Sequence, residues 1–183
     1  MSKPNSGHFK GTTGYNNSQK NSSQILKKNV IINSEKYDTR EHPTKHKQMS
    51  FKKLQLLRKK LNTRTITKEE YKRLEWQRRL TARRNEAIKQ FWIDERRKIK
   101  NGLPTTRNWN ATQIKEIMSK KIPTFKGRSM SSHHLYSVSK YPHLANKKEL
   151  IYPATFYEHI YGFHGGNTRN SLPGIPIKNI KEF

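Results

Sequence analysis

The chain has 183 residues, only 31% of them hydrophobic, and its 39 Lys and Arg against 13 Asp and Glu give a net charge of +26. It has no run of about 18 apolar residues and no apolar segment near its N-terminus, so neither a transmembrane helix nor a signal peptide is readable, and membrane insertion is not expected. Without cysteine, the chain has no disulfide or thiolate metal site, and any metal must bind through nitrogen and oxygen. Such a charge favours a polyanionic partner, and nucleic acid over a membrane surface.

The N-terminal quarter of the chain differs in composition from the rest. Residues 1–47 are rich in Ser, Asn, Lys and Gly, which is typical of a linker or a weakly ordered arm. Residues 48–126 form a basic region with helical patterning. Its first predicted helix has Ser50 as the N-cap, and one buried stripe is expected from residues at spacings of three, three and four: Phe51, Leu54, Leu57 and Leu61.

Two further helices are predicted from capping signals. Thr67 and Glu70 match a capping box, and Gly102 suits the left-handed residue that follows a helix. Asn110 and Gln113 form a weaker box for a short third helix. The stretch "RRLTARRNE" in the long helix is either a solvated face or a phosphate-binding surface, because nearby carboxylates are too few to pair its arginines: Arg78, Arg79, Arg83 and Arg84.

Residues 127–183 contain most of the histidines but little of the charge excess, with six basic and three acidic residues from Ser132 onward. His133 and His134 are adjacent, so in a strand one side chain can face a metal and the other a substrate. His159 and His164 follow a turn and fit one side of a helix. Three imidazoles with an open position are typical of a catalytic metal site, which leaves one histidine as a general base, although each histidine alone also fits a packing role. His143 is expected to be a loop or packing residue.

The motifs "SHHLYSV" and "EHIYGFHGG" resemble the His-His branch of the HNH nuclease superfamily. This resemblance implies an α+β fold in which a basic helical N-terminal part precedes a ββα-metal motif. It also implies that His133, His159 and His164 bind one divalent ion (Zn, Ni or Mg) and that His134 activates water. Glu149 occupies the central polar position and is assigned a catalytic role, with Asn146 the nearest asparagine. The spacing of five between His159 and His164, where the family has four, requires a loosened helix or a ligand at the helix end.

Longer segments, including "NSGHFKGTTG", "NGLPTTRNW" and the histidine region, are similar to C-terminal toxin domains of Gram-positive LXG-type polymorphic toxins exported by type VII secretion. The similarity implies a domain that is secreted as part of a larger toxin and acts in the cytoplasm of a target bacterium. It also implies a cognate acidic immunity protein.

The sequence thus predicts a metal-dependent endonuclease that acts as an antibacterial toxin, with DNA favoured over RNA as the substrate. The adjacent phosphate is expected to be held by Arg128, Arg169 or an arginine of the long helix. Two alternatives remain: a non-catalytic basic nucleic-acid-binding protein, and a structural zinc module that presents the basic helix and has His143 or Glu158 as a fourth ligand.

Overall fold

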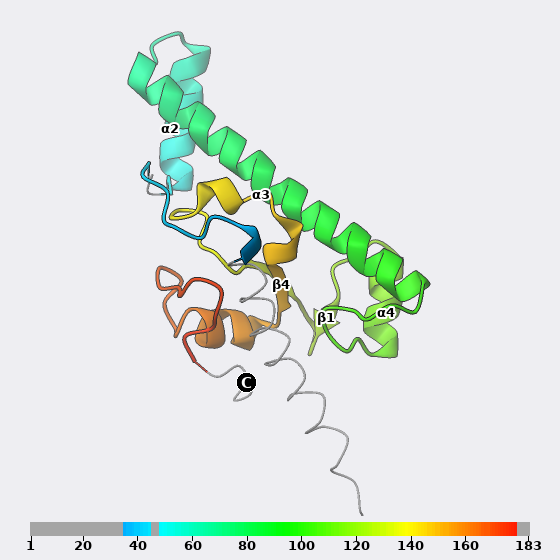
Figure 1. The fold of residues 1–183 in the computed structure, drawn as a ribbon. Coiled ribbons are helices and arrows are strands. Elements are labelled where there is room, and N and C mark those ends of the chain that lie inside the picture. Colours follow the sequence, from blue (N-terminus) through cyan, green and yellow to red (C-terminus); the bar gives the residue numbers. More distant parts are fainter. Residues whose placement is uncertain (1–34, 45–47, 179–183) are drawn as a thin grey trace, which may run out of the picture.

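The computed structural model describes residues 35–44 and 48–178, and the fold is α+β, as predicted (Figure 1). Of the predicted arm, residues 1–34 and 45–47 lie outside the described residues. The described helices are α2 (Phe51–Asn62), α3 (Lys68–Lys100), α4 (Ala111–Met118), two short 3-10 helices (Pro142–Leu144 and Lys148–Leu150) and a π-helix (Glu158–Phe163). The strands are β1 (Thr124–Phe125), β2 (Arg128–Ser129), β3 (Ser131–His134) and β4 (Ile151–Ala154). Within this part of the chain, no helix combines the length and the apolarity needed to cross a lipid bilayer.

The helix starts follow the predicted capping signals. The Ser50 side chain accepts a hydrogen bond from the Lys53 backbone at the start of α2. Reciprocal capping boxes open the next two helices, between Thr67 and Glu70 in α3 and between Asn110 and Gln113 in α4. These bonds satisfy backbone N–H groups that have no partner inside the helix, so each helix begins where the sequence places it.

The prediction of a buried stripe on α2 is wrong. Only Leu57 is buried in this helix, whereas Phe51 is 69% exposed and Leu61 is 39% exposed. Figure 1 shows the reason, because the described neighbour of α2 is the first half of α3, which contacts it along one side. A helix with one packed neighbour buries a narrower strip than its apolar residues span.

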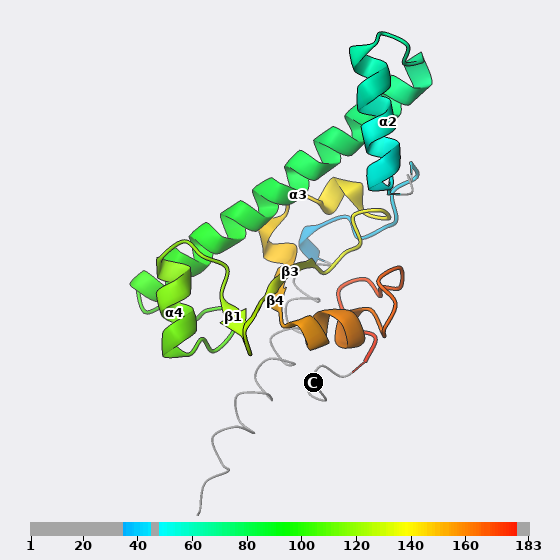
Figure 2. The same ribbon diagram turned by 180° about the vertical axis from the view of Figure 1, so that it is seen from behind.

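Helix α3, with 33 residues, is the longest described element, and the other elements lie along it (Figures 1 and 2). Helix α2 flanks its start, α4 its end, and the β3–β4 hairpin lies beside its middle, with the π-helix on the side of the hairpin that faces away from α3. One core cluster joins these parts, with Ala87, Phe91 and Trp92 of α3 packed with Ile117 of α4 and Ile151 of β4. The Trp92 ring nitrogen also donates to the Ser132 hydroxyl at 3.0 Å, so the long helix holds β3 directly.

Strands β3 and β4 are antiparallel and lead into the π-helix, which gives the ββα order. In the register, His133 lies opposite Tyr152 and His134 opposite Ile151. A second core cluster surrounds this hairpin and includes Leu135, Tyr152 and Phe163. Because side chains alternate along a strand, His133 and His134 point to opposite faces of β3.

Candidate metal centre

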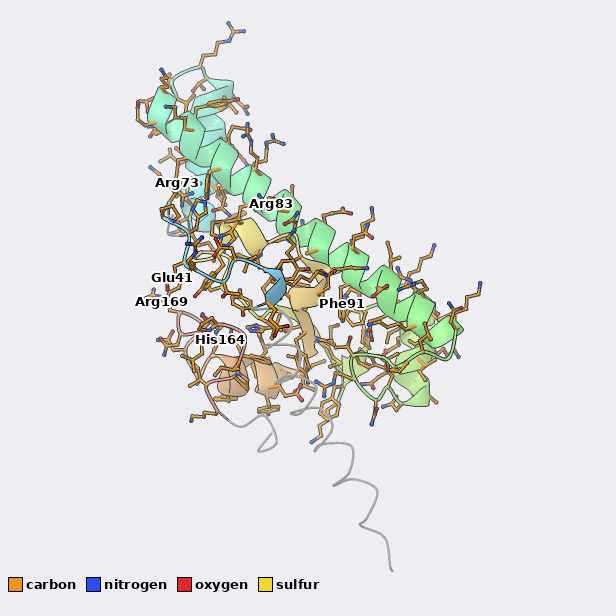
Figure 3. The ribbon with its side chains drawn as sticks, viewed as in Figure 1. Glu41, Arg73, Arg83, Phe91, His164 and Arg169 are labelled. Carbon is orange, nitrogen blue, oxygen red and sulfur yellow. The ribbon has the colours of Figure 1, made fainter. Side chains whose placement is uncertain are left out.

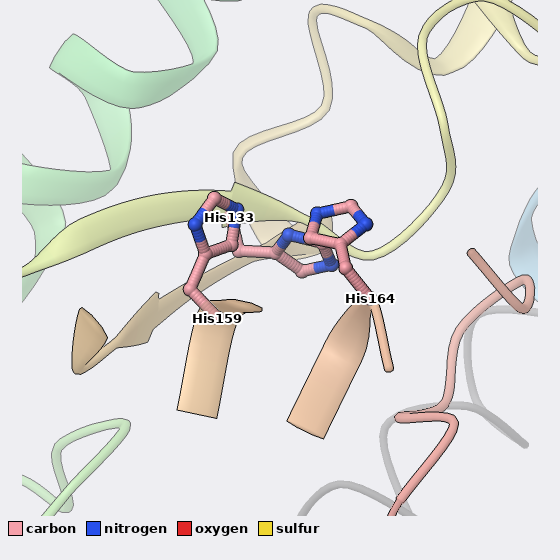
Figure 4. Close-up of side chains that lie close together, drawn as sticks. All are labelled: His133, His159 and His164. Atoms are coloured by element: carbon pink, nitrogen blue, oxygen red, sulfur yellow. The ribbon is translucent and has the colours of Figure 1, made fainter. Parts of the chain in front are cut away.

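Three of the predicted histidines converge on one point (Figure 4). The rings of His133 and His159 have centroids 5.1 Å apart, those of His133 and His164 5.2 Å, and those of His159 and His164 4.8 Å. One ligand nitrogen from each ring lies within 4.8 Å of the others, so the three side chains could hold one metal ion. Within the described residues, no other group of His, Asp and Glu side chains has this arrangement.

The π-helix accounts for the spacing of five residues between two of these ligands. His159 lies in its first turn, and His164 is the residue that follows its last turn. A π-helix has i→i+5 hydrogen bonds, which bring residues five apart onto one side, and such turns are frequent at functional sites. Gly165 and Gly166, with φ of 58° and 89°, then turn the chain away from the helix. Both alternatives expected from the sequence are therefore present, because the helix is loosened into a π-helix and His164 lies at its end.

Hydrogen bonding fixes which nitrogen of His164 is available to a metal. Nδ1 of His164 lies within hydrogen-bonding distance of the Asn170 carbonyl oxygen. A carbonyl only accepts, so Nδ1 carries the proton and Nε2 keeps a free lone pair. A backbone carbonyl behind a histidine ligand commonly orients the ring in this way. His133 is held by packing, with the Phe163 ring 4.2 Å from its own.

Two of the three imidazoles have pKa values below the usual range of histidine. Burial, followed by repulsion from the neighbouring histidines, lowers the pKa of His133 from 6.5 to about 2. Burial and the charge of His164 also lower the pKa of His159. Because a metal binds the neutral imidazole, both ligands are ready to bind it at neutral pH without first losing a proton.

His134 lies on the other face of β3 and is oriented separately. Its Nε2 lies 3.2 Å from the Ala145 carbonyl oxygen and therefore donates, which leaves Nδ1 unprotonated. Burial, and then the positive charge of Arg84, lower its pKa to about 4. His134 is thus neutral at pH 7 and has one nitrogen free to accept a proton.

All four histidines line one open cleft of about 940 Å³. The N-terminal end of α2 and the middle of α3 form one side, and β3, the π-helix end and residues 168–171 form the other. Arg169 lies on this last segment close to His164 (Figure 3). Arg84 contributes a half-buried guanidinium whose buried Nε has no hydrogen-bond partner in the part of the chain that the structure describes. The cleft therefore contains both the three-histidine centre and the Arg84 guanidinium, whose Nε is available to a bound group.

The other four arginines predicted to bind nucleic acid do not line this cleft. Arg78 donates to Glu75 at 3.0 Å, and Arg79 lies 3.9 Å from the same carboxylate. Arg83 donates to the His143 carbonyl at 2.9 Å and so supports a loop. Arg128 lies over the Phe156 ring at 4.8 Å.

The structure does not bring Glu149 to the histidines. Glu149 lines a separate pocket of about 240 Å³ and pairs with Lys36 at 3.6 Å. His143 also lies apart from the centre, and its Nε2 donates to the Asp38 carbonyl at 2.8 Å, in agreement with a packing role.

A residue that sequence reasoning missed supports the centre from behind. Arg107, between α3 and α4, donates to both carboxylate oxygens of Glu158, at 2.6 and 2.9 Å, and to the Pro153 carbonyl at 2.9 Å. Glu158 also accepts from the Thr155 backbone at 2.7 Å. This Arg107–Glu158 clamp fixes the first turn of the π-helix, next to His159. It also keeps the Glu158 carboxylate from serving as the fourth ligand of a closed zinc site. No local pattern signals it, because the partners are 51 residues apart.

One of three comparisons with known proteins found a match. No curated protein and no solved structure matches the chain. Residues 74–155 match the family model of the GHH signature containing HNH/Endo VII superfamily nuclease toxin. The matched range includes His133 and His134, and it ends before His159 and His164. Residues 74–155 are therefore similar to the GHH-signature nuclease toxins of the HNH/Endo VII superfamily.

Proposed function

We propose that this protein is a metal-dependent endonuclease that hydrolyses phosphodiester bonds of nucleic acid, DNA in preference to RNA, as an antibacterial toxin domain. The observation that carries the proposal is the separation of roles on β3, where His133 faces two further imidazoles and His134 faces the cleft with a free nitrogen. Both belong to a chain of charge +26, which suits a polyanionic substrate.

His133, His159 and His164 would hold the ion through one ring nitrogen each. Three nitrogen ligands suit zinc or nickel better than magnesium. Once bound, a divalent ion supplies positive charge that neutralises the phosphate and the leaving oxygen. The donor set fits a catalytic site better than a closed structural one, because His143 and Glu158, the candidates for a fourth ligand, are both engaged elsewhere.

The chain's own groups account for the proton transfer. Nδ1 of His134 takes a proton from water, and the water oxygen attacks phosphorus. The bond from phosphorus to the leaving oxygen breaks, and that oxygen departs as an oxyanion that takes a proton from solvent. The Ala145 carbonyl holds the ring in the correct tautomer and stabilises the imidazolium that forms. Arg84 and Arg169 hold the non-bridging phosphate oxygens. Glu149 has no part in this mechanism because it lies in another pocket.

The test separates the two adjacent histidines. His133→Ala should lose metal affinity and cleavage together, whereas His134→Ala should keep the metal while cleavage falls by about 10² or more. Calorimetric metal titrations are combined with nicking of supercoiled plasmid and digestion of total RNA, with and without EDTA. His143→Ala is the matched control and should cleave normally. Full activity of His134→Ala, or cleavage that is indifferent to EDTA, would refute the mechanism.

The toxin role has a separate test. Expression of the wild-type chain in bacteria should arrest growth, and His134→Ala should relieve the arrest. A cognate immunity protein should be acidic, because it must cover basic surface around the cleft, and co-expression should restore growth. Harmless expression of an active nuclease in the bacterial cytoplasm would contradict the antibacterial role.

A further inference from the structure

The cleft that holds the histidines has a second wall of different chemistry. Met49, Phe51 and Leu80 line it from the α2 end and from α3, together with the amide side chains of Gln48 and Gln77. None of these five groups carries charge, although the chain as a whole is strongly basic. An uncharged wall gains little from contact with phosphate, so it faces some other part of the substrate.

Phe51 is the most unusual member of this wall. It is the first residue of α2 and is 69% exposed, more than any other large hydrophobic residue that the structure describes. An exposed phenylalanine gives up the stabilisation that burial of its ring would provide, and no packing contact of α2 within the described residues requires an aromatic ring at this position. The Ser50 cap fixes the start of the helix, so the ring is presented from a rigid element.

The size of the cleft leaves room for more than a phosphate. A volume of about 940 Å³ lies at the upper end of the range for small-molecule sites, about 300–1,000 Å³. The histidines and Arg169 lie on one side, and Arg84, four residues beyond Leu80 on α3, approaches His134 from the other, so a phosphodiester would lie between the two arginines. A nucleotide whose phosphate lies there would bring its base to the uncharged side of the same cleft.

We propose that Phe51, with Met49 and Leu80 beside it, forms a stacking subsite for an unpaired nucleobase next to the scissile phosphate. Aromatic side chains bind bases through their faces with little sequence preference, whereas the Gln48 and Gln77 amides can donate to and accept from a base edge. A base inside a duplex is already stacked on both faces. The subsite therefore favours single-stranded or locally unpaired nucleic acid over intact duplex. This inference rests on the proposed nuclease function.

The test compares Phe51→Ala and Phe51→Trp with Phe156→Ala, a matched control because Phe156 is also exposed, at 39%, but does not line the cleft. On a single-stranded oligonucleotide, Phe51→Ala should lower kcat/KM by about 10- to 100-fold, and Phe51→Trp should restore it. Metal affinity and the salt dependence of binding should not change, because neither the imidazoles nor the phosphate contacts are altered. An oligonucleotide with an abasic position beside the cleavage site should bind the wild type and Phe51→Ala equally.

Two outcomes are kept apart by measuring binding in EDTA as well as cleavage. If the wild type cleaves and Phe51→Ala cleaves equally well, the subsite is wrong while the nuclease function stands. If the wild type cleaves nothing, the nuclease function is wrong, and the binding of intact against abasic oligonucleotide still decides whether Phe51 contacts a base. A Phe51→Ala variant that binds nucleic acid normally but loses affinity for an immunity protein would assign the wall to that partner and overturn the proposal.

Discussion

Removing Arg107 should weaken both the fold and the metal centre. The side chains of Arg107 and Glu158 are only 20% and 9% exposed. Arg107→Met therefore leaves the buried Glu158 carboxylate without its cation. Breaking a buried pair from one side costs about 3–5 kcal/mol, because the remaining charge stays desolvated. Since a domain of this size has about 5–15 kcal/mol of stability in total, the variant should fold with a much lower urea midpoint.

The same change should loosen metal binding, because Glu158 directly precedes His159. Loss of a group that orients a metal ligand typically costs 10- to 100-fold in affinity. Urea denaturation of the metal-free protein gives the first quantity, and calorimetric titration with Zn²⁺ gives the second.

A double-mutant cycle with Glu158→Gln isolates the pair. The double variant should lose less unfolding free energy than the two single variants lose together, since neither charge is then left without its partner. Lys140→Met breaks an exposed pair with Glu41, whose side chains are 51% and 37% exposed, and should cost less than about 1 kcal/mol. If Arg107→Met behaves like this control, and Zn²⁺ affinity is unchanged, the clamp does not hold the centre.

Three further predictions concern charge. Nucleic-acid affinity should fall by about 10³ or more between roughly 50 and 200 mM salt if six or more phosphates are contacted, measured by fluorescence anisotropy, and a salt-independent affinity would rule out the basic helices as the contact surface. Arg84→Ala should reduce cleavage by about 10- to 100-fold through loss of a charged hydrogen bond, whereas Arg78→Ala, already paired with Glu75, should have little effect in the same nicking assay. The metal-free protein should lose stability as pH falls from about 6.5 to 4, because His134 has a folded pKa of about 4 and the unfolded chain binds the proton first. That loss is roughly 2–3 kcal/mol from this residue, and urea midpoints for His134→Gln should decline less over the same range.

Local sequence patterns determined much of this protein. The capping pairs Thr67 with Glu70 and Asn110 with Gln113 act over three residues, so the sequence alone placed the starts of α3 and α4. Strand alternation separated His133 from His134 for the same reason, since the pleat depends only on neighbouring residues.

Longer-range features depended on which segments meet in space. The apolar spacing in α2 predicted burial of Phe51, but burial requires a neighbour, and the path of α3 provides one for Leu57 alone. Among six candidate arginines, only the positions of the cleft walls single out Arg84 and Arg169. The same packing moved Glu149 into another pocket and brought Arg107 to Glu158 across 51 residues. Periodicity and capping act through bonds within one or two turns, whereas these contacts arise when separate elements fold onto α3, and no short window of sequence contains both partners.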